Sequence, residues 1–230
     1  MIKHHPTATV LQQFVDGNLP ASISIIVASH VEICPHCQQH TMQLTEQAAQ
    51  SLFEPETLNQ VLDLNPSHAD LTLDEFDMMQ SITDIEIEET PVAIPLPKTV
   101  TEIDINGTRI ALPHSMKSIA LKEWQGIGKL SRARAALEDN NLKMSLLHIA
   151  KGGSIPTHTH HGFEITLLLE GSFHDDMGEY KTGDFMWLDG KHTHSPITDE
   201  GCVCLTVSSD AIHFTQGMSQ LLNPIGKFIY

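Results

Sequence analysis

Histidine and cysteine gather in two short segments, and both residue types are strong ligands for transition metals. The first segment, HVEICPHC, places His30, Cys34 and Cys37 at intervals of four and three residues. On one continuous helix these side chains would share a face. Because Pro35 suits the first turn of a helix, we expect the cysteines at a junction between two helices. Either arrangement brings three ligands together and predicts a structural zinc site.

A structural zinc has four ligands, so one more must come from elsewhere in the chain. Four further histidines are candidates: His4, His5, His36 and His40. His36 lies between the cysteines and should point away, whereas His40 falls again on the helix face. A ligand from the N-terminal pair would pin the N-terminus to the second and third helices. The alternative is that Cys34 and Cys37 are buried core residues and bind no metal.

The second segment, PTHTHHGFEITLLLEG at 156–171, places three histidines and a glutamate in front of an apolar run. On a strand, His158 and His160 share a face because side chains alternate with a period of two. Glu164 follows after a short turn, so it can face the same way. Two imidazoles and one carboxylate suit Zn, Fe, Mn, Ni or Cu. The pattern predicts a second metal site.

This second segment has the spacing of the first cupin motif, in which a glycine leads two histidines and a glutamate. The second cupin motif, GDFMWLDGKHTHSPIT from Gly183, gives His194 at the expected offset, with His192 as the runner-up. The motif departs from the cupin pattern at three positions: Asp189 for the usual Pro, Gly190 one place early, and Thr198 for the usual Asn. We expect four cupin ligands: His158, His160, Glu164 and His194. The alternative is a cupin that has lost its metal and serves only as a scaffold.

Cys202 and Cys204 lie two residues apart in CVCLTVSS, so on a strand they face the same way. Neighbouring residues of one strand seldom close a disulfide, which favours buried apolar thiols. A redox role beside the metal is the alternative. The remaining histidines of this half are interpreted as surface or hydrogen-bonded polar residues: His148, His161, His174 and His213.

Residues 1–85 are expected to form a small zinc-binding bundle of about four helices. Apolar residues at helical spacing precede Gly17, a second helix covers Ser22 to Val31, and a third runs from Pro35 to about Leu52. The fourth is suggested by apolar positions from Leu71 to Ile82. The fold class is therefore α+β with two domains.

Residues 86–99 contain three prolines and little periodicity, which indicates a linker. From about residue 100 the pattern is typical of strands. TEIDINGTRIAL predicts a hairpin around Asn106-Gly107, and alternating runs separated by Gly and Asp turns follow. Such short, regular strands predict a β-sandwich or barrel over residues 100–230.

The chain of 230 residues carries 13 basic and 29 acidic residues, a formal charge of −16. That charge repels nucleic acid and anionic membranes and attracts a basic partner. Residues 51–100 hold 11 of the acidic residues and a single basic one, Lys98. No signal core or apolar run long enough to span a membrane is visible, so we expect a cytoplasmic protein without direct nucleic-acid or membrane binding.

HxxxCxxC in an N-terminal helical domain resembles the zinc-binding domain of bacterial anti-sigma factors. The whole chain resembles ChrR-type anti-sigma factors in its HH start, HxxxCxxC, proline-bearing linker, HxHxxxE, THSP at 193–196 and CVCL at 202–205. The resemblance implies zinc bound by His5, His30, Cys34 and Cys37, and it alone selects His5 over His4. It also implies Zn²⁺ or another divalent transition metal in the cupin.

The resemblance further implies a regulator and not an enzyme. Such proteins hold an extracytoplasmic-function sigma factor inactive and release it when singlet oxygen or organic hydroperoxide appears. One alternative is a metal-dependent cupin enzyme, such as a dioxygenase or isomerase, with an accessory helical domain. Another is a sensor in which metal occupancy sets the sigma interaction. A cupin sheet face can also pair two chains, so a homodimer is compatible with the sequence.

Overall fold

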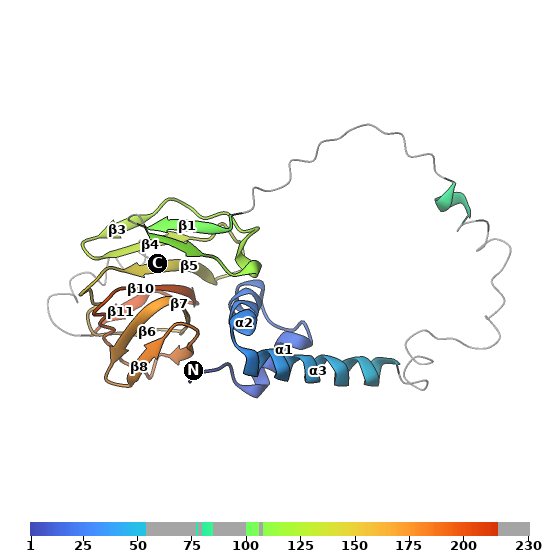
Figure 1. The fold of residues 1–230 in the computed structure, drawn as a ribbon, viewed down its shortest axis with the longest axis horizontal. Coiled ribbons are helices and arrows are strands. Elements are labelled where there is room, and N and C mark those ends of the chain that lie inside the picture. The colour runs from blue at the N-terminus through green and yellow to red at the C-terminus, as the bar shows by residue number, and fades with distance from the viewer. Residues whose placement is uncertain (54–76, 78–79, 85–99, 106–107, 216–230) are drawn as a thin grey trace. The chain divides into compact units, whose positions relative to one another are not determined.

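The structure is a computed structural model that describes residues 1–53, 77, 80–84, 100–105 and 108–215 (Figure 1). The chain divides into two compact units, one of residues 1–42 with 98–230 and one of residues 43–97. The first unit holds the N-terminal helices, every described strand and all four cysteines. Among the described residues, no helix is long and apolar enough to cross a membrane.

Three helices begin and end close to the positions that the sequence predicts: α1 (Ala8–Val15), α2 (Ala21–Ile33) and α3 (Pro35–Phe53). The side chain of Thr7 caps α1 by accepting a hydrogen bond from the Val10 amide. Cys34 has an extended backbone that ends α2, and Pro35 opens α3. The expected helix junction is confirmed. The predicted fourth helix falls largely outside the described residues, of which 80–83 are helical.

Every strand pair among the described residues is antiparallel, as expected of short strands joined by tight turns. The antiparallel register pairs Ile105 with Thr108, the residues on either side of Asn106-Gly107, which confirms the predicted hairpin. A seven-stranded sheet has the order β3-β4-β5-β10-β7-β8, with β9 also on β7, and β11 pairs with β6. The strands are β1 (Glu102–Ile105), β2 (Thr108–Ala111), β3 (Gln125–Ile127), β4 (Leu130–Arg134), β5 (Lys143–Ile149), β6 (His158–His160), β7 (Phe163–Asp175), β8 (Gly178–Lys181), β9 (Phe185–Asp189), β10 (Cys202–Ser208) and β11 (Ile212–Phe214).

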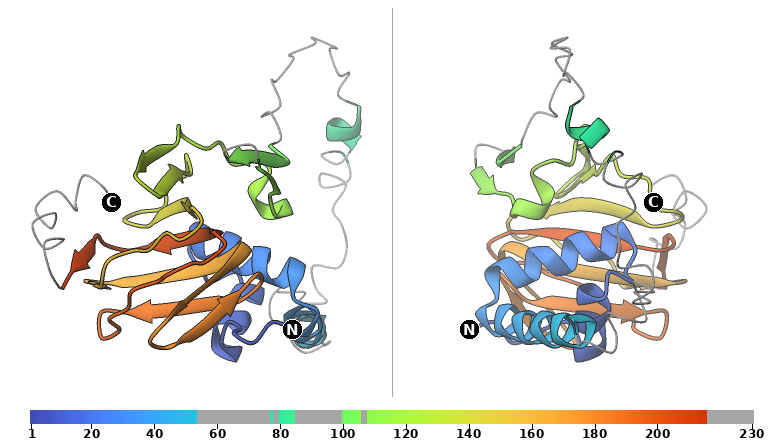
Figure 2. Two further views of the ribbon diagram at one scale, coloured as in Figure 1. Left: turned by 60° about the vertical axis from the view of Figure 1, so that its left-hand side comes forward. Right: turned by 90° about the vertical axis from the view of Figure 1, so that its right-hand side faces the viewer.

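Both faces of the central strands are buried, because one face lines the sandwich interior and α2 covers the other. Figure 2 shows α2 lying across the sheet, and α2 contacts β10, β7 and the short 3-10 helix η2 (His114–Met116). Ile26 and Val27 of α2 are fully buried there, as are Leu205 and Val207 of β10. This burial on two sides explains why β10 has six consecutive buried residues, Cys202–Val207, in place of alternation.

Polar contacts hold α2 along its whole length. The Ser22 amide donates to Asp139 Oδ2 at 2.7 Å, at the end of the helix where free amides need partners. The Ser29 hydroxyl lies 2.7 Å from that of Ser115, and Glu32 accepts from the His114 amide at 2.7 Å. The N-terminal helices and the sandwich therefore share one core. The boundaries expected at residues 85 and 100 remain predictions.

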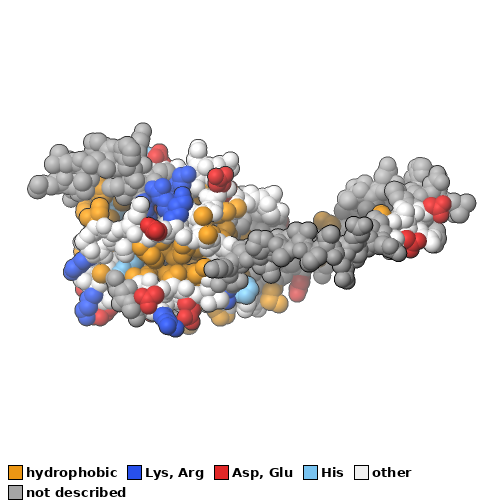
Figure 3. Space-filling view, turned by 90° about the horizontal axis from the view of Figure 1, so that it is seen from above, with side chains coloured by type: hydrophobic (Ala, Val, Ile, Leu, Met, Phe, Trp, Pro, Cys, Tyr) orange, Lys and Arg blue, Asp and Glu red, His pale blue; other side chains and the backbone are white. Residues whose placement is uncertain are grey.

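The excess negative charge is not gathered on the face that Figure 3 shows. There, Lys and Arg side chains are as prominent as Asp and Glu, and an apolar area lies between them. The acidic stretch identified at residues 51–100 falls mostly outside the described residues. The predicted attraction of a basic partner through that stretch stays a prediction.

Gly171 lies inside β7, where the part of the strand that pairs with β10 meets the part that pairs with β8. We expect Gly171→Ala to lower the free energy of unfolding by about 3–4 kcal/mol. Its φ is +76°, and an added Cβ would collide with the backbone carbonyl of Gly201. Gly128, at the β3–β4 turn, is the matched control, since its φ is +61° but nothing lies near its Cβ position. Gly128→Ala should cost only the backbone strain, about 1–2 kcal/mol. Urea unfolding read by tryptophan fluorescence compares them; equal losses would contradict this account.

Candidate metal centres

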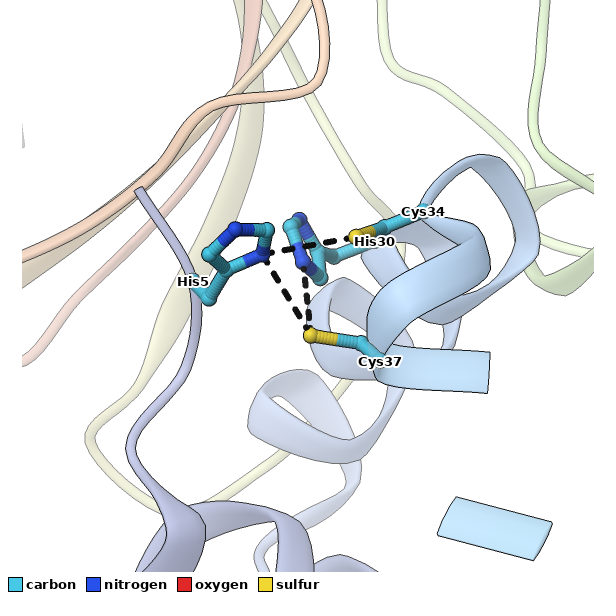
Figure 4. A group of neighbouring side chains, drawn as sticks. All are labelled: His5, His30, Cys34 and Cys37. Atoms are coloured by element: carbon cyan, nitrogen blue, oxygen red, sulfur yellow. Dashed lines mark hydrogen bonds between the residues drawn. The ribbon is translucent and has the colours of Figure 1, made fainter. Parts of the chain in front are cut away.

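The N-terminal cluster joins three elements that are separate in the chain. His5 comes from the segment before α1, His30 from the last turn of α2, and Cys34 and Cys37 from the α2–α3 junction (Figure 4). Their four ligand atoms all lie within 4.8 Å of one another. The two cysteines and His30 are buried, and His5 is half-buried. The structure thus brings together the four residues that the sequence analysis named.

The spacing of the ligand atoms fits a tetrahedral zinc ion. His5 Nδ1 lies 3.3 Å from Cys34 Sγ and 3.5 Å from Cys37 Sγ, and His30 Nε2 lies 3.3 Å from Cys37 Sγ. With zinc bonds of about 2.3 Å to sulfur and 2.0–2.1 Å to nitrogen, the edges of a tetrahedron are about 3.5 Å long. The donor set and its geometry therefore fit zinc.

The protonation states of the buried ligands also favour a bound cation at this cluster. Burial lowers the pKa of His30 to about 4, so its imidazole is neutral and can ligate at neutral pH. Burial and the neighbouring Cys34 raise the pKa of Cys37 to about 12. Such a thiol stays protonated unless a positive charge stabilises the thiolate, and a divalent metal supplies that charge.

The other N-terminal histidines are not members of this ligand group. The ring of His4 turns to Tyr180 and Asp184, with Nδ1 3.4 Å from Asp184 Oδ1. His36 is exposed and His40 half-exposed, and neither belongs to the cluster. Adjacent residues of an extended segment point in opposite directions, which sends His5 to the cysteines and His4 to the sandwich.

The second cluster lies inside the sandwich, where His158, His160 and His194 bring their ligand nitrogens within 4.8 Å of one another. His160 is central. Its Nε2 lies 3.4 Å from His194 Nε2 and 3.1 Å from Glu164 Oε2. Strand β6 carries His158 and His160 on one face, and an antiparallel backbone bridge between His158 and His194 places His194 beside them. Three of the four expected cupin ligands therefore form the cluster, and Glu164 contacts it through His160 but is not one of the mutually close groups.

Surrounding groups orient these ligands. His158 Nδ1 lies 2.8 Å from the Pro156 carbonyl, and since a carbonyl only accepts, Nδ1 carries the hydrogen and Nε2 is free to ligate. Thr166 donates to Glu164 Oε1 at 3.0 Å. Asp175 Oδ2 lies 3.3 Å from His194 Nδ1 and is fully buried. The sequence analysis missed Asp175, because a carboxylate eleven residues after Glu164 has no motif position.

Burial sets the charge state of this site. It lowers the pKa of His158, His160 and His194 to about 4 and raises the pKa of Glu164. Neutral imidazoles facing one another across 3.4 Å offer lone pairs to a shared cation. Two or three imidazoles with one carboxylate suit several first-row metals, so this donor set fits a metal without selecting one.

Two of the three departures from the cupin pattern, Thr198 and Gly190, have local explanations. Thr198 is buried; its hydroxyl donates to the Ser172 carbonyl at 2.6 Å and accepts from the Gly201 amide at 2.9 Å, which closes the loop before β10. Gly190 passes so close to the His160 carbonyl that a Cβ would lie 2.5 Å from that oxygen. The runner-up His192 is exposed and pairs with Asp189 at 2.8 Å, outside the cluster.

Cys202 and Cys204 are buried, free and on one side of β10, in a cluster with Tyr180, Met186 and Leu168. None of the four cysteines of the chain forms a disulfide. A hydrogen bond between the two side chains lowers the pKa of Cys202 and, with burial, raises that of Cys204. Their redox role stays a prediction.

Known proteins resemble this chain in sequence and in fold. Residues 120–211 match the family described as the ChrR cupin-like domain. The chain is 24% identical over 225 residues to the anti-sigma-E factor ChrR of Cereibacter sphaeroides, covering 97% of both chains. The crystal structure of Rhodobacter sphaeroides SigE in complex with the anti-sigma ChrR matches with a TM-score of 0.60 and 21% identity, over 90% of this chain and 100% of that one. Residues 120–211 thus resemble the ChrR cupin-like domain, and the whole chain, with its N-terminal helices, resembles ChrR-type anti-sigma factors.

Proposed function

We propose that this protein is an anti-sigma factor that binds an extracytoplasmic-function sigma factor and keeps it inactive. One observation carries the proposal: the likeness to the anti-sigma-E factor ChrR extends over 97% of both chains and so includes helices, cysteine pair and cupin together. The chain is a homologue of a regulator rather than of an enzyme. Because the partner works with RNA polymerase, we place the protein in the cytoplasm.

The N-terminal cluster supports the proposal through its chemistry. His5, His30, Cys34 and Cys37 would hold Zn²⁺, which supplies fixed tetrahedral bonds and no reaction. These bonds would tie three chain segments together. The ion would thereby fix the direction in which α3 leaves the junction, and the exposed face of α3 would be available to the partner.

The cupin is proposed to sense singlet oxygen or organic hydroperoxide. His158, His160, Glu164 and His194 would hold Zn²⁺ or another divalent transition metal, and Cys202 and Cys204 lie in the same interior. Reaction of an oxidant at a ligand or a buried sulfur would disturb the sheet on which α2 is packed. A pure metal sensor would instead respond to metal concentration without oxidant.

The test uses the full chain, because α2 is packed on the sandwich and isolated helices would expose Ile26 and Val27. Tagged protein is mixed with lysate of the source organism, and captured proteins are identified by mass spectrometry. We expect one sigma factor in equimolar amount. Capture of no sigma factor by folded, zinc-loaded protein would contradict the proposal and favour the cupin enzyme.

A further inference from the structure

The turn between β8 and β9, residues 181–185, contacts the N-terminal zinc cluster although it belongs to the cupin. It holds the extended segment Ile2–His5, which supplies the ligand His5. It also touches His30, the ligand from α2. No sequence motif links this turn to the HxxxCxxC segment, which lies about 150 residues away in the chain.

Asp184 is the main anchor of the N-terminal segment. Its side chain is 3% exposed. Oδ1 accepts from the amides of Lys3 at 2.7 Å and His4 at 2.9 Å, and Oδ2 accepts from the Lys181 amide at 2.9 Å. The Phe185 amide donates to the His4 carbonyl at 3.0 Å. A buried carboxylate with three amide donors makes strong, charge-assisted bonds that fix the backbone next to His5.

Gly183 contacts the second ligand directly. Its carbonyl accepts from His30 Nδ1 at 2.9 Å, so Nδ1 carries the hydrogen and Nε2 faces Cys37. A backbone carbonyl behind a ligand histidine fixes its tautomer and ring orientation. The Phe185 ring meets the His30 ring at 5.7 Å between centroids. Ile2 lies directly over Gly183, where a Cβ would come within 2.5 Å of its side chain.

We propose that residues 181–185, the ligand clamp, are part of the N-terminal zinc site and set how tightly the chain holds zinc. The clamp positions His5 through Asp184 and His30 through Gly183, while the cysteines need no such help because the α2–α3 junction holds them. The inference rests on the proposed zinc binding. It assigns the cupin a direct structural role in the sigma-binding region.

The clamp also joins the two metal sites mechanically. Gly183 and Asp184 are hydrogen-bonded to Leu168 of β7 in both directions, at 2.9 and 3.1 Å. Strands β7 and β9 continue this pairing, and Glu164, four residues before Leu168, lies opposite Leu188, four residues after Asp184. A shift of β7 and β9 at the cupin ligands would therefore reach the clamp through a continuous antiparallel ladder. This ladder is the physical connection through which cupin chemistry would loosen zinc.

The test measures zinc release from the full, zinc-loaded chain to a coloured chelator. Asp184→Ala should release the N-terminal zinc about 10-fold faster than wild type, the lower range for loss of a group that orients metal ligands. Asp184→Asn, which keeps one acceptor oxygen, should fall between. The matched control is Asp199→Asn, which removes the same charge at an exposed position. Cobalt substitution should show two sulfur ligands in each folded variant.

Unchanged release from Asp184→Ala would overturn the clamp, whereas a wild-type chain without N-terminal zinc would contradict the zinc site itself. If Asp184→Ala does not fold, the wild-type chain supplies the test. Zinc removal should then speed hydrogen exchange at the amides of Lys3, His4 and Phe185, relative to the β10 amides. Equal exchange with and without zinc would also overturn the clamp.

Discussion

Replacing Cys34 and Cys37 with serine is expected to remove the N-terminal zinc and abolish sigma binding. Structural zinc in small domains contributes apparent energies on the order of 10–16 kcal/mol near pH 7, comparable to the whole stability of a domain. Serine offers no thiolate, so the remaining two histidines cannot hold the ion. We expect sigma affinity to fall by at least about 100-fold, roughly 2.8 kcal/mol.

The unfolding that follows should be local, because the helices depend on zinc unequally. The buried residues of α3 are Cys37 and Thr41, so within the described part of the chain the packing of α3 is concentrated at the N-terminal cluster. In contrast, α2 keeps its contacts with β10, β7 and η2. Hydrogen exchange should therefore speed up in α3 and in residues 2–7, while α2 and β10 remain protected.

The matched control is His40→Ala, which removes an imidazole from the same helix outside the cluster. It should keep one equivalent of N-terminal zinc and bind the sigma factor like wild type. Zinc content by mass spectrometry and affinity by calorimetry check both variants. A serine variant that retains zinc and full affinity would contradict the assignment of this site.

Helix and strand positions could be predicted because local signals act over a few residues. Pro35 and the extended Cys34 mark the helix junction, and Asn106-Gly107 matches the register of β1 with β2. The metal clusters were equally accessible, since ligand spacing on a strand or at a junction follows from backbone periodicity. Metal ligands that lie within one short segment can thus be predicted from the sequence without knowledge of the fold.

The choice between His4 and His5 could not be derived from the residues, because it depends on a contact distant in sequence. Asp184 accepts hydrogen bonds from the amides of Lys3 and His4. These bonds fix the direction of the segment, so that the side chain of His5 faces the cysteines. The packing of α2 on the sandwich was missed for the same reason. Its buried residues include polar Ser22, Ser29 and His30. The Ser22 amide and the side chains of Ser29 and His30 have their partners after residue 100 in the chain. Hydrophobic periodicity alone does not reveal such a face.

Replacing His160 with alanine should separate the two proposed roles of the protein. His160 Nε2 lies 3.4 Å from His194 Nε2 and 3.1 Å from Glu164 Oε2, so its loss should empty the cupin site. This variant keeps all four residues of the N-terminal cluster, so that cluster should stay filled. We expect His160→Ala to inhibit the sigma factor fully and to lose induction by singlet oxygen or organic hydroperoxide. A sigma-dependent reporter in cells, with metal content of the purified chain, measures both.

His192→Ala is the control for this prediction, because His192 lies two residues from a cupin ligand yet is exposed and paired with Asp189. It should keep metal, inhibition and induction. Full induction in His160→Ala would show that the cupin metal is not needed for sensing, and attention would move to Cys202 and Cys204. Loss of inhibition in a folded His160→Ala chain would instead mean that the cupin site supports the sigma-binding helices. The α2 contacts and the ligand clamp provide the route for such support.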